Sequence, residues 1–133
     1  MKDHFGRNIN YLRLSITDRC NLRCKYCMPH GVAFTPHEQI LTYEEFLRIA
    51  QVAVRLGITR FKVTGGEPLV RKGAVDFIAA LKRLPGVEEV TLTTNGVRLA
   101  ELLGSLQCFQ CLLGILIGIH RIDLHSYRKL VFK

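Results

Sequence analysis

Short segments in which apolar and polar residues alternate recur along the chain, and this is the two-residue period of a strand with one buried face. In residues 11–16 the apolar side chains alternate with Arg13 and Ser15. Residues 60–64 and 89–94 are two further segments of this kind, and both are rich in β-branched residues, which favour strands. The pattern predicts three strands.

A helical period follows each predicted strand. Thr42, with Glu45 three residues later, is the signature of a capping box, so we expect a helix to begin there. Gly57 is placed to end that helix. Residues 74–84 and about 97–106 predict two more helices. The predicted inward face of the first helix consists of Phe46, Ile49, Ala50, Ala53 and Leu56.

The order of these elements predicts the fold class. Strand and helix alternate three times at a spacing of roughly 30 residues, which is typical of βα units in a parallel sheet. We therefore expect an α/β fold of three βα units, with the strands side by side and the helices on one face. In such folds the loops that follow the strands meet at one rim, where ligands bind. These loops are the cysteine-bearing loop, residues 65–68 and residues 93–96.

The βα pattern also predicts the domain organisation. The chain has 133 residues, of which 48% are hydrophobic, so it can form one domain with a core of its own. We assign residues 1–106 to this domain. Residues 107–133 have lost the βα pattern and form an atypical tail without an assigned fold. Within the tail, residues 112–119 suit a buried strand and an apolar helix equally well.

Charge and hydropathy narrow the range of partners. The chain carries a formal charge of +8, but its basic residues are spread along the sequence without a dedicated run. We therefore predict no nucleic-acid partner, and we expect a basic face that attracts an anionic substrate. The most apolar run, residues 109–119, is shorter than the roughly 18–20 residues that a membrane span needs, so no membrane partner is predicted.

The cysteines indicate the compartment. The chain has five of them, an odd number that does not suit a secreted disulfide framework. The first ten residues are polar and lack the apolar segment of a signal peptide. We expect a cytoplasmic protein with reduced thiols.

Three of the cysteines form a metal-binding pattern. Cys20, Cys24 and Cys27 are spaced C-x3-C-x2-C. Three thiolates can hold three irons of a [4Fe–4S] cluster and leave the fourth iron open to a ligand. A zinc site is the alternative, completed by a nearby histidine or by the Cys108 and Cys111 pair. The spacing alone favours an iron–sulfur cluster, while zinc and inert cysteines stay open.

With these motifs in order, the chain resembles the radical S-adenosylmethionine (SAM) enzymes. The cysteine loop, with Tyr26 before its last cysteine, is similar to their CxxxCx(aromatic)C loop, and residues 65–68 are similar to their SAM-binding GGEP motif. Residues 12–21 and 92–96 resemble a narrower family, the GTP 3′,8-cyclases of molybdenum cofactor biosynthesis. The resemblance covers residues 5 to about 103.

The resemblance implies about half of a partial (β/α) TIM-like barrel, a [4Fe–4S] cluster and SAM as cofactors, and a homodimer as the candidate assembly. It implies a lyase of molybdopterin biosynthesis that converts GTP to (8S)-3′,8-cyclo-7,8-dihydroguanosine 5′-triphosphate. No catalytic side chain is assigned, because the radical forms on the cofactor.

The resemblance also assigns roles to single residues. It implies that Cys20, Cys24 and Cys27 bind the cluster. It implies that Tyr26 and Gly66 contact SAM, where the missing Cβ of glycine lets the backbone reach a ligand. It implies that Arg13, Lys62 and Thr93 contact GTP. The family usually has arginine where Lys62 stands, so the charge is kept and the planar fork is lost.

The sequence departs from the family after residue 103. The family continues with further strands and an extension that carries a second three-cysteine cluster, which the tail does not resemble. We therefore expect a truncated radical SAM core with a GTP 3′,8-cyclase-like function. The alternative is a non-catalytic fragment that binds an iron–sulfur cluster or zinc.

Overall fold

The computed structural model describes residues 2–24, 27, 33–102, 115–117 and 120–121. In this part of the chain the strands form one sheet in the order β1-β2-β3-β4-β5. Strands β1 to β4 run parallel to their neighbours, and β5 is antiparallel to β4. The strands are β1 (Tyr11–Ser15), β2 (Arg60–Thr64), β3 (Glu89–Thr94), β4 (Ile115–Ile117) and β5 (His120–Arg121).

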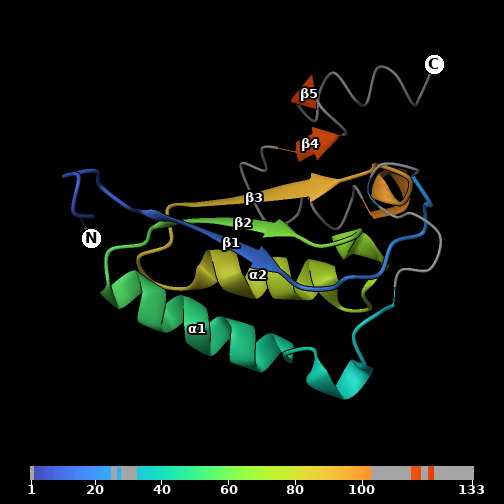
Figure 1. Cartoon of the computed structure of the whole chain (residues 1–133), viewed down its shortest axis with the longest axis horizontal. Coiled ribbons are helices and arrows are strands. Elements are labelled where there is room, and N and C mark those ends of the chain that lie inside the picture. Colours follow the sequence, from blue (N-terminus) through green and yellow to red (C-terminus); the bar gives the residue numbers. More distant parts are fainter. Residues whose placement is uncertain (1, 25–26, 28–32, 103–114, 118–119, 122–133) are drawn as a thin grey trace.

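Two α-helices connect the first three strands. Helices α1 (Tyr43–Arg55) and α2 (Ala74–Arg83) both lie on the same face of the sheet (Figure 1). Each is preceded by a short 3-10 helix, η1 (His37–Gln39) and η2 (Pro68–Val70). Residues 99–102 after β3 are also helical. The predicted α/β class with three βα units is confirmed.

The two faces of the sheet differ in polarity. On the face toward the helices, most side chains of β1 to β3 are apolar and buried, and the core continues into both helices. The opposite face carries Arg13, Lys62 and Thr91, which are partners in register on neighbouring strands. The buried core residues of the strands and helices include Leu14, Phe61, Val63, Val90, Leu92, Phe46, Ala50, Phe77, Ile78 and Leu81.

The ends of α1 follow the sequence closely. Thr42 accepts a hydrogen bond from the Glu45 backbone N–H at 3.2 Å, and Glu45 accepts one from the Thr42 N–H at 2.7 Å, so the predicted capping box is formed. At the other end Gly57 has a φ of 90°, in the left-handed region. Ile58 N–H then bonds the Ala53 carbonyl at 3.0 Å, which is the Schellman ending that favours glycine.

The predicted inward face of α1 is partly wrong. Phe46, Ala50 and Ala53 are buried, but Ile49 and Leu56 are 41% and 58% exposed. At 100° per residue the two exposed positions lie roughly 60–80° to one side of the buried three. The apolar stripe of α1 is therefore wider than the area that the sheet and α2 cover.

The structure also finds strands that the alternation did not predict. Ile115–Ile117 pairs with β3 as β4, and His120–Arg121 pairs with β4 as β5. An apolar run without alternation fits a strand and a helix equally, so the pattern could not decide. Most of the tail, including Cys108 and Cys111, lies outside the described residues, and so does Tyr26. No helix in the described part of the chain has the length and apolarity to cross a membrane.

Candidate functional site

The loops after β1, β2 and β3 meet at one rim, as the βα order predicts. The Glu67 N–H, after β2, bonds the Arg19 carbonyl, after β1, at 2.8 Å. The Asn95 side chain, after β3, donates through Nδ2 to Oδ1 of Asn21 at 2.8 Å. The three segments with distinctive motifs are thus in direct contact.

Two glycines allow the first two loops to run side by side. The Gly66 N–H bonds the Thr17 carbonyl at 2.7 Å, which continues the pairing of β1 and β2 beyond the strands. A Cβ on Gly65 would lie 2.4 Å from the Thr17 oxygen, and one on Gly66 would lie 2.5 Å from the Arg19 oxygen. Both contacts are far below van der Waals distance. The packing of the chain on itself therefore requires glycine here, and the contact of Gly66 with SAM stays a prediction.

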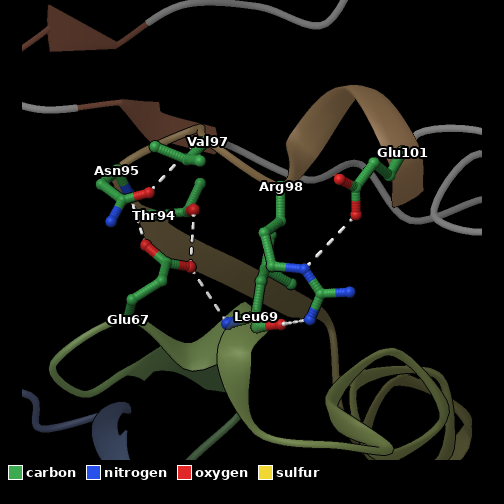
Figure 2. A network of polar contacts seen from close by, with 7 residues as sticks. All are labelled: Glu67, Leu69, Thr94, Asn95, Val97, Arg98 and Glu101. Carbon is green, nitrogen blue, oxygen red and sulfur yellow. Dashed lines mark hydrogen bonds and ion pairs between the residues drawn. The ribbon is translucent and has the colours of Figure 1, made fainter. Parts of the chain in front are cut away.

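Glu67 ties the second loop to the third. The residue is only 1% exposed. Its carboxylate lies among hydrogen-bond donors, as Figure 2 shows. Oε1 accepts from Leu69 N–H at 3.0 Å and from the Thr94 hydroxyl at 2.8 Å, and Oε2 accepts from Asn95 N–H at 2.6 Å. Glu67 lies in the segment that the sequence identified by its similarity to the GGEP motif. Its reach across to β3 was missed, because a bond between residues 28 positions apart leaves no local pattern.

The three cysteines lie in the loop that follows β1. Cys20 and Cys24 are partly buried and Cys27 is exposed, and all three are free thiols. The Cys27 N–H bonds the Cys24 carbonyl at 3.2 Å, so the loop turns between them. Burial raises the pKa of the Cys24 thiol, and the neighbouring thiols of Cys27 and Cys20 raise it further.

The end of the cysteine loop, at residues 34–35, contacts its beginning at residues 18–19. Asp18 accepts the Thr35 N–H through Oδ2 at 2.5 Å, and this bond holds the pKa of Asp18 below its ordinary value. The guanidinium groups of Arg19 and Arg23 lie 5.3 Å and 5.6 Å from the centre of the Phe34 ring. Cation–π contacts of this kind join the two ends of the loop.

The three thiols are not arranged as a metal site in the described structure. Among the described residues, no group of three or more His, Cys, Asp and Glu side chains is gathered around a point that could hold a metal ion. The cysteine loop therefore brings three thiols into one region without converging them.

The predicted GTP contacts lie on the face of the sheet opposite the two helices. Arg13 and Lys62 are register partners on β1 and β2, on the side away from the helices. Thr93 lies on the same face, because the flanking Leu92 and Thr94 are both buried on the helix side. Arg13 is exposed, and Lys62 and Thr93 are partly buried. The fold thus places all three on one surface.

The sequence that forms this rim matches a known protein family. The sequence profile of the radical SAM superfamily matches residues 14–126. The chain belongs to the radical SAM superfamily.

Curated relatives narrow the comparison. The GTP 3′,8-cyclase of Thermodesulfovibrio yellowstonii is 57% identical over 103 residues, which are 76% of this chain and 32% of the relative. That of Geobacter sulfurreducens is 56% identical over 106 residues, 79% of this chain and 32% of the relative. Molybdenum cofactor biosynthesis protein 1 of Bos taurus is 50% identical over 108 residues, 80% of this chain and 17% of the relative. The chain spans about a third or less of the length of these relatives.

The superfamily uses a [4Fe–4S] cluster and SAM, and the donors at this rim fit both. Three free thiols in one loop are the ligands that such a cluster takes. Oδ1 of Asp18 is a buried acceptor with no hydrogen-bond partner in the described structure, so the rim holds an acceptor for an ammonium group such as that of SAM.

We expect Gly65→Ala to destabilise the fold through the close approach of the first two loops. Its Cβ would meet the Thr17 carbonyl oxygen at 2.4 Å, and overpacking of this kind costs about 1–3 kcal/mol. Gly6→Ala is the control, because Gly6 has a φ of 78° and nothing within 4 Å of an added Cβ, which leaves backbone strain of about 1 kcal/mol. Urea unfolding of both variants measures the difference. Equal losses would show that the close approach is not the reason for glycine at position 65.

We expect Glu67→Gln to lower the free energy of unfolding by about 1–3 kcal/mol, the cost of a buried group left without its partner. The carboxylate accepts at both oxygens, whereas the amide would turn an NH₂ group toward either the Asn95 N–H or the donors of Leu69 and Thr94. The matched control is Glu101→Gln, which alters an exposed ion pair and should change stability by less than about 0.5 kcal/mol. Chemical unfolding compares the two, and a stability of Glu67→Gln equal to that of the control would contradict the assigned role.

Proposed function

We propose that this chain carries the cluster-binding and SAM-binding site of a GTP 3′,8-cyclase, an enzyme that converts GTP to (8S)-3′,8-cyclo-7,8-dihydroguanosine 5′-triphosphate in molybdopterin biosynthesis. The observation that carries the proposal is the three-thiol loop held against the Gly-Gly-Glu turn at the strand ends. The curated relatives support it, since those of two bacteria have this name.

In this proposal the thiolates of Cys20, Cys24 and Cys27 would hold the cluster, with SAM bound beside it. When bound, the cluster and SAM would supply the radical chemistry. The work of the chain is to bind and orient. Tyr26 and Gly66 position SAM, and Glu67 keeps the third loop against the SAM-binding turn.

The face of the sheet opposite the two helices supports the proposed binding of an anionic substrate. Arg13 and Lys62 stand side by side on neighbouring strands, where two like charges repel each other. Within the residues that the structure describes, neither cation belongs to an ion pair. A triphosphate would relieve the repulsion by accepting hydrogen bonds from both. Thr93 adds a hydroxyl on the same face.

The location and assembly stay predictions from the sequence. We propose a cytoplasmic protein that works on a small molecule, forms a homodimer and binds neither nucleic acid nor a membrane. Reduced thiols at an oxygen-sensitive cluster would require the reducing conditions of the cytoplasm.

The metal assignment predicts distinct results for Cys24 and for the pair Cys108 and Cys111. We expect the anaerobically reconstituted chain to be brown, to contain about four irons and four sulfides, and to release 5′-deoxyadenosine from SAM with dithionite. Cys24→Ala should lose the colour and the product, because a ligand is gone. The control, Cys108→Ala combined with Cys111→Ala, should keep both.

The cluster content is measured by iron and sulfide analysis and by absorbance, and 5′-deoxyadenosine is measured by mass spectrometry. A colourless protein that binds zinc would support the alternative of a non-catalytic metal-binding fragment. Equal loss of colour in both variants would reject the assignment of the ligands.

Lys62→Ala removes a charge from the proposed GTP site. It should weaken GTP binding by roughly 10- to 100-fold, since a hydrogen bond to a charged group contributes about 1.5–3 kcal/mol. Lys62→Arg keeps the charge and should bind GTP about as well as the parent chain. Arg48→Ala removes the same charge from the exposed surface of α1, on the far side of the sheet, and is the matched control. Equilibrium dialysis with labelled GTP measures the dissociation constants. An equal loss for Arg48→Ala and Lys62→Ala would mean that only net charge matters.

A further inference from the structure

We propose that Asn95 is a positioning residue that donates a hydrogen bond to the sulfur of Cys20, and that this bond raises the reduction potential of the cluster and helps to retain it. The inference rests on the proposed function, because it takes Cys20 as a cluster ligand. The sequence placed Asn95 in one of the three loops at the rim, but no pattern in it pointed to a contact with Cys20, which lies 75 positions away.

The orientation of the Asn95 amide is fixed by three partners. Its Nδ2 lies 3.7 Å from Sγ of Cys20 and donates to Oδ1 of Asn21 at 2.8 Å. Its Oδ1 accepts the Val97 N–H at 3.0 Å. A flipped amide would place an oxygen against the Asn21 oxygen and an NH₂ against an N–H. The network therefore turns the donor group of Asn95 toward the sulfur.

The backbone of Asn95 is anchored as firmly as its side chain. Its N–H bonds Oε2 of Glu67 at 2.6 Å, and the preceding Thr94 donates to the other oxygen of that carboxylate (Figure 2). Glu67 is itself buried against η2 through the Leu69 N–H. Asn95 is therefore held by the same group that holds the SAM-binding turn.

The position of Cys20 at the rim is fixed by hydrogen bonds of its own loop. The residue before it, Arg19, accepts the Glu67 N–H through its carbonyl at 2.8 Å. The Arg23 guanidinium bonds the Cys20 carbonyl at 2.7 Å, and the Leu22 N–H lies 3.4 Å from the Cys20 sulfur. The sulfur thus faces two N–H donors, one from its own loop and one from Asn95.

This arrangement has a direct consequence for a bound cluster. Hydrogen bonds to the sulfurs of an iron–sulfur cluster are among the factors that set its reduction potential. An N–H donor stabilises negative charge on the thiolate, and reduction adds negative charge, so the donor favours the reduced state. Asn95 does this without adding a charge of its own. Partners that orient a ligand also strengthen metal binding.

The test compares Asn95→Ala and Asn95→Asp with the parent chain, each reconstituted anaerobically at full length. Ala removes the donor, while Asp keeps the size and the oxygen toward Val97 but turns a negative charge toward the sulfur. We expect the midpoint potential, followed by electron paramagnetic resonance, to be lower in Ala and lower still in Asp. Loss of iron to a chelator should be roughly 10- to 100-fold faster.

Arg98→Gln is the matched control. Arg98 donates to the Leu69 carbonyl at 2.8 Å in the same network, but it forms no contact with Cys20 that the described structure shows. It should lose stability in thermal melting without a change in potential. Circular dichroism confirms that each variant is folded, and if Asn95→Ala unfolds, Asn95→Asp decides the question.

Two outcomes overturn the proposal in different ways. Folded Asn95 variants with the potential and iron retention of the parent chain would reject the role of Asn95 and leave the proposed function intact. A parent chain that assembles no cluster would reject the proposed function and this inference together.

Discussion

The rim depends on one buried carboxylate. Glu67 is 1% exposed and accepts three hydrogen bonds from two segments, η2 and the end of β3. A buried carboxylate is costly unless donors surround it, so its donors become obligatory parts of the fold. The ends of β2 and β3 are therefore held together by the need to satisfy a charge, in addition to the apolar core beneath them.

Gly65 and Gly66 allow the loop after β1 to pack against the loop after β2, and Glu67 holds the loop after β3 against the same turn. The backbones after β1 and β2 approach so closely that a Cβ on Gly65 or Gly66 would meet a carbonyl oxygen at 2.4 Å or 2.5 Å. The three consecutive residues from Gly65 to Glu67 thus connect the segments that follow all three strands. This short turn contains Gly66, which is proposed to contact SAM, and it binds the backbone of Asn95 through Glu67. The proposed SAM contact and the contact of Asn95 with the Cys20 sulfur therefore lie at the same rim.

The sequence predicts what local patterns control. Strand alternation, the Thr42 capping box and the Gly57 ending all have a physical cause within a few residues, and the structure confirms them. The resemblance of the cysteine loop and of residues 65–68 to known motifs indicated the superfamily, which the sequence profile confirms. The bonds from Glu67 to Asn95 and from Asn95 to Cys20 span 28 and 75 positions, so no local pattern could indicate them. The burial of α1 was over-predicted for Ile49 and Leu56, because periodicity shows which side is apolar but not how much of it a neighbour covers.

The contrast between the rim and the cysteine loop determines how a cluster would assemble. Cys20 is fixed to the strand ends through Arg19, Glu67 and Asn95, whereas Cys27 is exposed and bonded only to its own loop in the described structure. Among the described residues no group of three donors is gathered for a metal, whereas Cys20 already has a fixed place. Where the ligands of a site are not preformed, metal binding is coupled to the arrangement of those ligands. A prearranged first ligand lowers the entropic cost of that step, because one of the three thiols is already in place.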